Sequence, residues 1–233
     1  MKYFYQKESK EILDELNTTT SGLDSKEVEK RQEKYGLNVL PEAPRPSGFQ
    51  IFLNQFKDLI VLILIAAAVI SGVTGDAESS IVIVVVLIIN AILGTTQTLN
   101  AQRSVDSLKQ LSVPKVKVIR DGVKQEIDSH HLTIGDIVEF EAGDMIVADA
   151  RIIEASSLQV QESALTGESH AVDKNTNVVE GEVVVGDQTN MVFTGSQVTY
   201  GKGQAVVTSI GVNTEIGKIS ELLNNASSGK SPL

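Results

Sequence analysis

The chain has 233 residues, a formal net charge of −10 at pH 7 and no cysteine. Because binding to nucleic-acid phosphates needs a cluster of lysine and arginine, which this acidic sequence lacks, nucleic acid is excluded as a partner. The lack of cysteine excludes a disulfide framework, a thiolate metal site and a cysteine nucleophile within these residues.

The N-terminal part of the chain, residues 1–58, is predicted to be a cytoplasmic region of short helices. Its clearest helix spans residues 24–35, where Asp24 is in the N-cap position and Glu27 follows at the third helical position. Charged residues surround this helix on nearly all sides, which is typical of a solvated helix rather than of a binding surface. Three prolines then predict an extended connector: Pro41, Pro44 and Pro46.

Residues 59–102 carry no basic and only two acidic side chains, and they contain nine consecutive apolar residues, Ile81–Ile89. A bilayer core about 30 Å thick needs about 20 apolar residues of helix. The sequence therefore predicts a transmembrane hairpin with helices at about 59–75 and 79–99. Two buried core helices of a soluble protein are the alternative, and the length of the apolar run argues against them.

The two sides of this hairpin differ in charge. The connection Gly75–Glu78 is acidic, whereas Lys57, Arg103 and Lys109 flank the helices on the other side. Because basic residues favour the cytoplasmic side, both termini are predicted to be cytoplasmic. Apolar and polar residues are mixed over 49–56, which indicates an amphipathic entry at the membrane interface. Neither span contains an ionisable residue, so an ion-binding site is not expected within the hairpin.

Residues 103–225 are predicted to be a compact antiparallel β domain with flanking helices at 103–111 and 213–224. Beyond Pro114 apolar residues recur with a period of two, and Asp121-Gly122 between two such runs is a strong hairpin signal. Further short strands are predicted at 137–140, 150–153, 158–161, 183–185, 191–193 and 205–210.

Most standard catalytic patterns are missing from the sequence. The segment Gly195–Lys202 lacks the spacing of a phosphate-binding loop, and the three histidines lack the spacing of a zinc site. The segment Thr166-Gly167-Glu168 differs, because a glycine between a hydroxyl residue and an acid allows a sharp turn that exposes a carboxylate. Such a carboxylate could orient or deprotonate a water molecule. On the residues alone, an ordinary turn is the other interpretation.

The sequence SALTGES at Ser163–Ser169 resembles the actuator-domain signature of the P-type cation-transporting ATPases. Four further blocks resemble that family in the same order: Gly22–Asn38, Gly135–Val138, Gly143–Arg151 and Gly211–Ile219. The resemblance covers almost the whole chain. It implies a membrane protein of the α+β class, with short N-terminal helices, a two-helix transmembrane hairpin and an all-β, distorted jelly-roll-like actuator domain with flanking helices.

The resemblance also implies a chemistry. In this family ATP phosphorylates an aspartate, and the actuator domain then swings its loop to the aspartyl phosphate while its rotation pulls on the membrane helices. Glu168 would position the attacking water and act as the base of an in-line displacement. The loop that shields the phosphoryl group would be shaped by the neighbours of Glu168: Thr166, Gly167 and Ser169.

Several parts of such a pump are not among these 233 residues. The phosphorylated Asp-Lys-Thr-Gly-Thr segment, the nucleotide-binding domain and the ion-binding helices do not occur in the sequence. The chain is therefore expected to be the N-terminal portion of a longer pump, with the Ser- and Gly-rich residues 226–233 as a linker towards a third membrane helix. The complete pump would use ATP and Mg²⁺, whereas this chain alone is expected to bind no cofactor or metal and to be inactive.

The transported ion is expected to be Ca²⁺, because the N-terminal block and Asn90–Gly94 resemble calcium and related cation pumps. The lack of Cys-x-x-Cys modules and of histidine tracts argues against the soft-metal branch, whose ligands are thiolates and imidazoles. Sodium/potassium, magnesium and proton pumps are the alternatives. The expected partners are membrane lipid and the rest of the pump, and the expected location is a bacterial plasma membrane, as a multi-pass protein.

A different class of function is the alternative: a truncated, non-catalytic β domain, anchored by the hairpin, that binds or regulates a partner pump. A sequence that continues past Leu233 into a phosphorylation motif would exclude it. A soluble hydrolase that uses Glu168 alone is a poor third interpretation, because no second acid, nucleophile or metal cluster accompanies that residue.

Overall fold

The computed structural model of the chain describes residues 3–40, 46–111 and 113–228. The chain forms two compact units: the β unit, residues 1–42 with 113–233, and the helical unit, residues 43–112. The N-terminal region is predicted to end at residue 58, whereas in the structure the described residues up to Leu40 belong to the β unit. Pro41 and Pro44 of the predicted connector, and residues 229–233 of the linker predicted at 226–233, lie outside the described residues.

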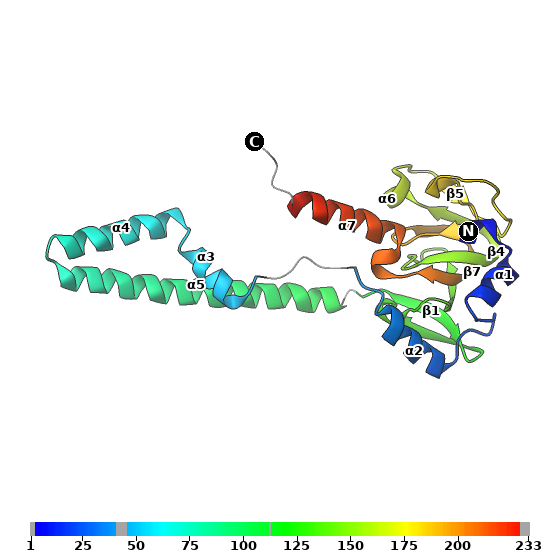
Figure 1. The fold of residues 1–233 in the computed structure, drawn as a ribbon, viewed down its shortest axis with the longest axis horizontal. Helices are drawn as coiled ribbons and strands as arrows, with labels where there is room; N and C mark the ends of the chain where they lie inside the picture. The colour runs from blue at the N-terminus through cyan, green and yellow to red at the C-terminus, as the bar shows by residue number, and fades with distance from the viewer. Residues whose placement is uncertain (1–2, 41–45, 112, 229–233) are drawn as a thin grey trace. The chain divides into compact units, whose positions relative to one another are not determined.

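The β unit contains a seven-stranded sheet in which neighbouring strands are antiparallel (Figure 1). The strands are β1 (Lys115–Arg120), β2 (Val123–Asp128), β3 (Ile137–Glu141), β4 (Asp149–Gln161), β5 (Ala171–Asp173), β6 (Met191–Val192) and β7 (Gln197–Ser209). Their order is β2-β1-β3-β7-β4-β5, and β6 pairs with β4 off this path. The prediction of an α+β chain with an antiparallel sheet is confirmed.

The hairpin between β1 and β2 forms where the sequence predicts it. Asp121 and Gly122 have φ angles of 52° and 72°. A type I′ turn needs positive φ at both central positions, which Asp-Gly provides at low cost. The strands pair in register from Arg120 opposite Val123, so this prediction is confirmed.

Three other predicted strands do not occur as separate strands in the structure. The strands predicted at 150–153 and 158–161 are parts of the single long strand β4, which has bulges opposite β7. Ser157, with a φ angle of 49°, lies at one of these irregularities. A bulge interrupts the alternation of inward and outward side chains, so the sequence pattern looks like two strands. In place of the strand predicted at 183–185, Val185–Asp187 form a short 3₁₀ helix, η3.

Helices precede, interrupt and follow the sheet. In the β unit they are η1 (Phe4–Gln6), α1 (Ser9–Glu15), α2 (Ser25–Tyr35), η2 (Ser129–His131), α6 (Ser163–Thr166), η3, η4 (Gly211–Asn213) and α7 (Glu215–Ser228). α2 begins as predicted, because the Asp24 side chain accepts the Glu27 N–H at 2.8 Å. α7 continues past residue 226, where the sequence predicted a linker to begin.

The two faces of the sheet bury different sets of side chains. Fifteen buried residues form the main core: Val118, Leu132, Val138, Phe140, Ile146, Ala148, Ala150, Ile152, Leu158, Val160, Val192, Val198, Ala205, Val207 and Ile210. Because side chains alternate along a strand, their neighbours Ile119, Ile137 and Val206 face the other way, and Ile12 of α1 packs against them. This contact explains why the N-terminal residues belong to the β unit.

The helical unit consists of α3 (Gly48–Gln55), α4 (Leu59–Val73) and α5 (Ala77–Leu111). α4 packs against α5, and the Ser80 hydroxyl donates to the Ala68 carbonyl oxygen at 2.8 Å where the two helices meet. α3 and α4 are bent by 66° at a short break. At this break Asp58 caps α4 by accepting the Ile60 N–H.

The predicted transmembrane hairpin is matched only in part. Among the described residues, one helix, Ala77–Ser107 within α5, is long and apolar enough to cross a membrane alone. α4 has 15 residues, and it meets the same criterion only together with α3. The helices predicted at 79–99 and 103–111 are one continuous helix, because no proline or glycine separates them.

Candidate active site

The residues singled out by the sequence lie in the connection between β4 and β5, Glu162–His170, termed the signature loop. Its ends are held together because Gln161 of β4 pairs with Ala171 of β5, and the Gln161 side-chain amide donates to the Ser169 carbonyl oxygen at 3.2 Å. The loop begins with the single helical turn α6 (Figure 1). Residues 166–169 are therefore placed together at the exposed end of a hairpin.

Thr166 and Gly167 fix the turn that follows α6. The Thr166 hydroxyl donates to the Glu162 carbonyl oxygen (3.1 Å) and accepts the Glu168 N–H (3.2 Å). Gly167 has a φ angle of 77°, the left-handed conformation with which glycine ends a helix at little cost. The Glu168 side chain is exposed and makes no hydrogen bond or ion pair to any described residue, so its carboxylate is available to a group from outside the chain.

A buried ion pair lies at the base of the signature loop. The side chains of Glu162 and Lys174 are 1% and 0% exposed, and Lys174 Nζ lies 2.6 Å from Glu162 Oε1. Burial raises the pKa of Glu162 and lowers the pKa of Lys174, and the attraction between the two groups opposes both shifts. Lys174 Nζ also donates to the Gln188 carbonyl oxygen at 3.3 Å. The pair thus joins the start of α6 to the segment that follows β5.

Gly186 and Gly195, near the signature loop, lie close to atoms of other elements. A Cβ atom on Gly186 of η3 would lie 3.2 Å from the Thr166 methyl group. A Cβ atom on Gly195 would lie 2.9 Å from Ile216 of α7 and 3.9 Å from Ala164 of α6. The absence of a side chain at Gly186 therefore lets α6 pack closely against η3, and its absence at Gly195 lets Ile216 of α7 pack closely on that turn.

Asp149 ties the sheet to the same turn of α7. Its two carboxylate oxygens accept the N–H groups of Thr194 (2.9 Å) and Glu215 (2.7 Å). Burial raises the pKa of Asp149, and these two hydrogen bonds oppose the shift. Because Glu215 is the first residue of α7, the carboxylate satisfies one of the N–H groups that a helix N-terminus leaves free.

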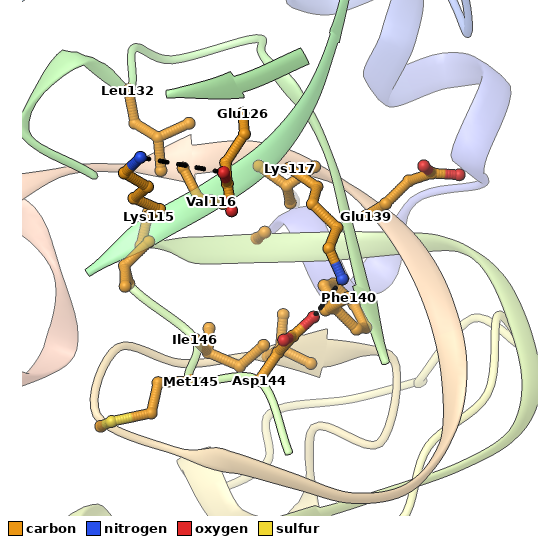
Figure 2. Close-up of a pocket in the computed structure, with 15 residues that line it drawn as sticks. Lys115, Val116, Lys117, Glu126, Leu132, Glu139, Phe140, Asp144, Met145 and Ile146 are labelled. Carbon is orange, nitrogen blue, oxygen red and sulfur yellow. Dashed lines mark hydrogen bonds and ion pairs between the residues drawn. The ribbon is translucent and has the colours of Figure 1, made fainter. Parts of the chain in front are cut away.

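A cavity elsewhere in the β unit has a different character. Its volume is about 60 Å³. Figure 2 shows residues of β1, β3 and the segment 144–146 around it. Charged side chains at its edge pair with one another: Lys115 with Glu126 (3.9 Å) and Lys117 with Asp144 (3.5 Å). The residues that line it do not include the signature loop, so we assign the candidate chemistry to the loop.

Comparison with known proteins now identifies the family. Residues 110–224 match the P-type ATPase actuator domain, and residues 4–71 match the N-terminal domain of cation transporters and ATPases. Over 229 residues the chain is 45% identical to the calcium-transporting ATPase lmo0841 of Listeria monocytogenes, a match that covers 98% of the chain. The chain belongs to the P-type cation-transporting ATPases.

This P-type ATPase chain spans 26% of the length of three bacterial relatives that it matches. The relatives include calcium-transporting ATPase 1 of Lactococcus lactis, 43% identical over 98% of the chain, and the calcium-transporting ATPase of Bacillus subtilis, 43% identical over 99% of the chain. The actuator-domain match contains the whole sheet and the signature loop. The β unit is therefore an actuator domain together with N-terminal residues that pack on it.

Sequence reasoning missed the ion pair beneath the loop of this actuator domain. Glu162 and Lys174 are twelve residues apart and look like ordinary surface charges in the sequence. One sequence signal pointed to Glu162: it follows the apolar residues Leu158 and Val160 at the same spacing of two. Since residues two apart on a strand share a face, Glu162 was a candidate for the interior.

Proposed function

We propose that this chain is the N-terminal quarter of an ATP-driven calcium pump and that its actuator domain promotes hydrolysis of an aspartyl-phosphate intermediate. The family and the calcium-transporting relatives support the proposal. ATP and Mg²⁺ act in parts of the pump beyond this chain, and we assign no residue here to either. The bacterial relatives favour a plasma-membrane location, with the helical unit spanning the membrane as a hairpin.

The observation that carries the proposal is the position of Glu168. Its side chain is exposed and free of partners among the described residues, while its backbone is fixed through the Thr166 hydroxyl. A Cβ atom on Gly167 would meet nothing within 4 Å, so the glycine is needed for its positive φ angle rather than for space. A rigid turn that presents a free carboxylate suits the approach to a phosphoryl group on another domain.

The reaction assigned to the signature loop is an in-line displacement at phosphorus. Glu168 orients a water molecule and accepts its proton while the water oxygen bonds to phosphorus. The bond between phosphorus and the aspartate oxygen breaks, the aspartate carboxylate is regenerated, and inorganic phosphate leaves. Thr166, Gly167 and Ser169 hold the shape of the loop around the reacting group.

The helical unit is proposed to transmit movement rather than to bind the ion. Its two apolar segments, 59–75 and 79–99, contain no ionisable side chain, and membrane ion sites are usually built with such side chains. We therefore place the calcium site in membrane helices beyond this chain.

The decisive experiment is Glu168→Gln in the complete pump. Loss of the base should leave formation of the phosphoenzyme from ATP intact and slow its decay by roughly 100-fold or more, the usual contribution of general acid–base catalysis. Decay is followed with labelled ATP after a chase with unlabelled ATP.

Glu180→Gln is the matched control, because Glu180 is an exposed carboxylate of the same unit outside the signature loop. The phosphoenzyme of Glu180→Gln should decay at the normal rate. Unchanged decay in Glu168→Gln would contradict the assignment of the base, and failure of the unmodified pump to form a phosphoenzyme would contradict the proposed function as a whole.

A further inference from the structure

Asn38 lies close to the point where the chain leaves the β unit, and its side chain binds three separate segments of that unit. Nδ2 donates to the carbonyl oxygens of Ser129 (3.1 Å) and Val147 (2.9 Å), and Oδ1 accepts the Gly211 N–H (2.8 Å). The Asn38 backbone N–H donates to the His130 carbonyl oxygen at 3.0 Å. Four hydrogen bonds therefore fix one half-buried residue.

Two of these partners link Asn38 to other connections of the β unit. Ser129 donates its N–H to the carbonyl oxygen of Pro114 at 2.9 Å, and Pro114 stands just where the chain enters the β unit from α5. Gly211 opens η4, which leads directly into α7. Asn38 is thus bonded to the start of the connection through α7 and, through Ser129, to the end of the connection from α5.

The packing around Gly211 provides an independent observation. A Cβ atom on Gly211 would lie 2.8 Å from the Val39 carbonyl oxygen, so the backbone that follows Asn38 passes directly over this glycine. A Cβ atom on Gly217 of α7 would lie 2.3 Å from the Gly211 carbonyl oxygen. The outgoing chain, η4 and α7 are therefore in backbone contact, with no room for a side chain between them.

The hydrogen-bond pattern around position 38 selects asparagine. Two carbonyl oxygens and one N–H face the side chain, and an asparagine amide offers two donor hydrogens and an acceptor oxygen on one short stem. An aspartate would have no donor for the carbonyl oxygens, a serine would have one, and a glutamine would be longer by one methylene. The same pattern fixes which way the amide points.

We propose that Asn38 is a positioning residue of the pump, which locks the three connections of the actuator domain into one rigid junction. When the domain rotates, the connections then move together with it. The signature loop therefore keeps a fixed position relative to the connections as it approaches the aspartyl phosphate. This inference rests on the proposed function, because the third connection, beyond α7, exists only in a complete pump. The junction comprises Asn38, Pro114, Ser129, Val147 and Gly211.

The test compares Asn38→Ala with Thr18→Val in the complete pump. Thr18→Val removes another hydrogen bond of the same unit, from the buried Thr18 hydroxyl to the Gly135 carbonyl oxygen (2.9 Å), which does not involve the junction. Asn38→Ala should form phosphoenzyme with unchanged calcium dependence, and this phosphoenzyme should decay roughly 2- to 30-fold more slowly, the range for residues that couple distant sites. The phosphoenzyme of Thr18→Val should decay at the normal rate.

Hydrogen exchange in the complete pump gives a second readout. In Asn38→Ala the amides of Ser129 and Gly211 should exchange faster, whereas in Thr18→Val they should not. If Asn38→Ala does not fold, Asn38→Asp serves in its place, because it keeps the acceptor for Gly211 and loses both donors, and its phosphoenzyme should also decay slowly.

The possible outcomes separate the inference from the function on which it rests. Normal decay in the Asn38 variants, or an equal slowing in Thr18→Val, would overturn the junction while leaving the pump assignment intact. An unmodified pump that forms no phosphoenzyme would overturn the proposed function and the junction with it.

Discussion

Glu162 and Lys174 place opposite charges in the interior of the β unit, at the base of the loop that carries Glu168. A buried ion pair is held by mutual attraction, but the loss of hydration opposes it, so the net stabilisation by an intact pair is small. Removal of one partner strongly lowers the stability, because the other charge then stays buried without an opposite charge beside it. The pair is therefore a strong constraint on which residues are tolerated at these two positions.

We predict that Glu162→Gln and Lys174→Met each lower the free energy of unfolding by about 3–5 kcal/mol. The double variant Glu162→Gln/Lys174→Met should lose much less than the sum, because no unpaired charge is left inside. Urea unfolding of the purified chain in mild detergent, followed by circular dichroism, measures all three.

The exposed pair Lys124–Glu139 (2.7 Å) is the matched control for this cycle. Because the Lys124 side chain is largely in solvent, Lys124→Met should change the free energy of unfolding by less than about 1 kcal/mol. Equal effects of Lys124→Met and Lys174→Met, or strict additivity of the Glu162 and Lys174 changes, would show that burial does not set the strength of the inner pair.

At the scale of elements, α2 shows how a helix covered with charge can still be an anchored part of the fold. Arg31 is only 7% exposed. Its guanidinium donates to the carbonyl oxygens of Ile134 (2.9 Å) and Leu16 (2.8 Å) and to the Glu27 carboxylate (2.7 Å). Gly135 makes space for it, since a Cβ atom there would lie 2.0 Å from Arg31 Nη1. Arg31 thus joins α2 to the end of α1 and to the segment before β3.

We predict that Arg31→Lys loosens α2, because an ammonium group cannot reach the three acceptors in the geometry of the guanidinium fork. A buried carbonyl left without a donor costs about 1–3 kcal/mol. Hydrogen exchange of the α2 amides should therefore become faster, while Lys26→Ala, at an exposed position of the same helix, should leave it unchanged. Equal protection of α2 in Arg31→Lys and the unmodified chain would contradict this role.

The elements that the sequence predicted well are those set by local chemistry. The Asp24 cap of α2 and the Asp121-Gly122 hairpin depend on residues adjacent in the chain, and both occur as predicted. Contacts made at a distance were not visible in this way. The solvated-helix interpretation missed the burial of Arg31, because hydrophobic periodicity records apolar faces and not a cation that docks on carbonyl groups. The bulges of β4 likewise depend on its pairing with β7.

In the candidate site, too, the local sequence predicts some features and contacts made by the fold determine the others. The motif located the exposed residues Thr166, Gly167 and Glu168, and the structure adds the hydrogen bonds that hold their backbone. The contacts that hold the loop come from residues outside it: Lys174 after β5 pairs with Glu162, and Gly186 in η3 lies against Thr166. These partners are brought together only by the fold, so the residues alone left an ordinary turn as a valid interpretation.

At the scale of the whole molecule, the length of α5 bears on how the chain is placed in a membrane. Its 35 residues, rising about 1.5 Å each, make a helix of about 50 Å, whereas the hydrocarbon core of a bilayer is about 30 Å thick. One end of α5 must therefore extend into water. The uncharged residues begin at Ser79, and the first basic residue of the helix is Arg103, so the extension lies at the C-terminal end of α5.

This arrangement predicts that both termini of the chain are cytoplasmic and that the turn before α5 is outside. The chain has no cysteine, so single cysteines can be labelled without background. Ala77→Cys, beside the acidic turn, should react with a membrane-impermeant maleimide on intact cells, because acidic loops lack the positive charges retained on the cytoplasmic side. Ser104→Cys, next to Arg103 on the same helix, should react only after the membrane is made permeable. Labelling of Ala77→Cys only in permeable cells would reverse the topology, and the actuator domain would then be on the side opposite to ATP.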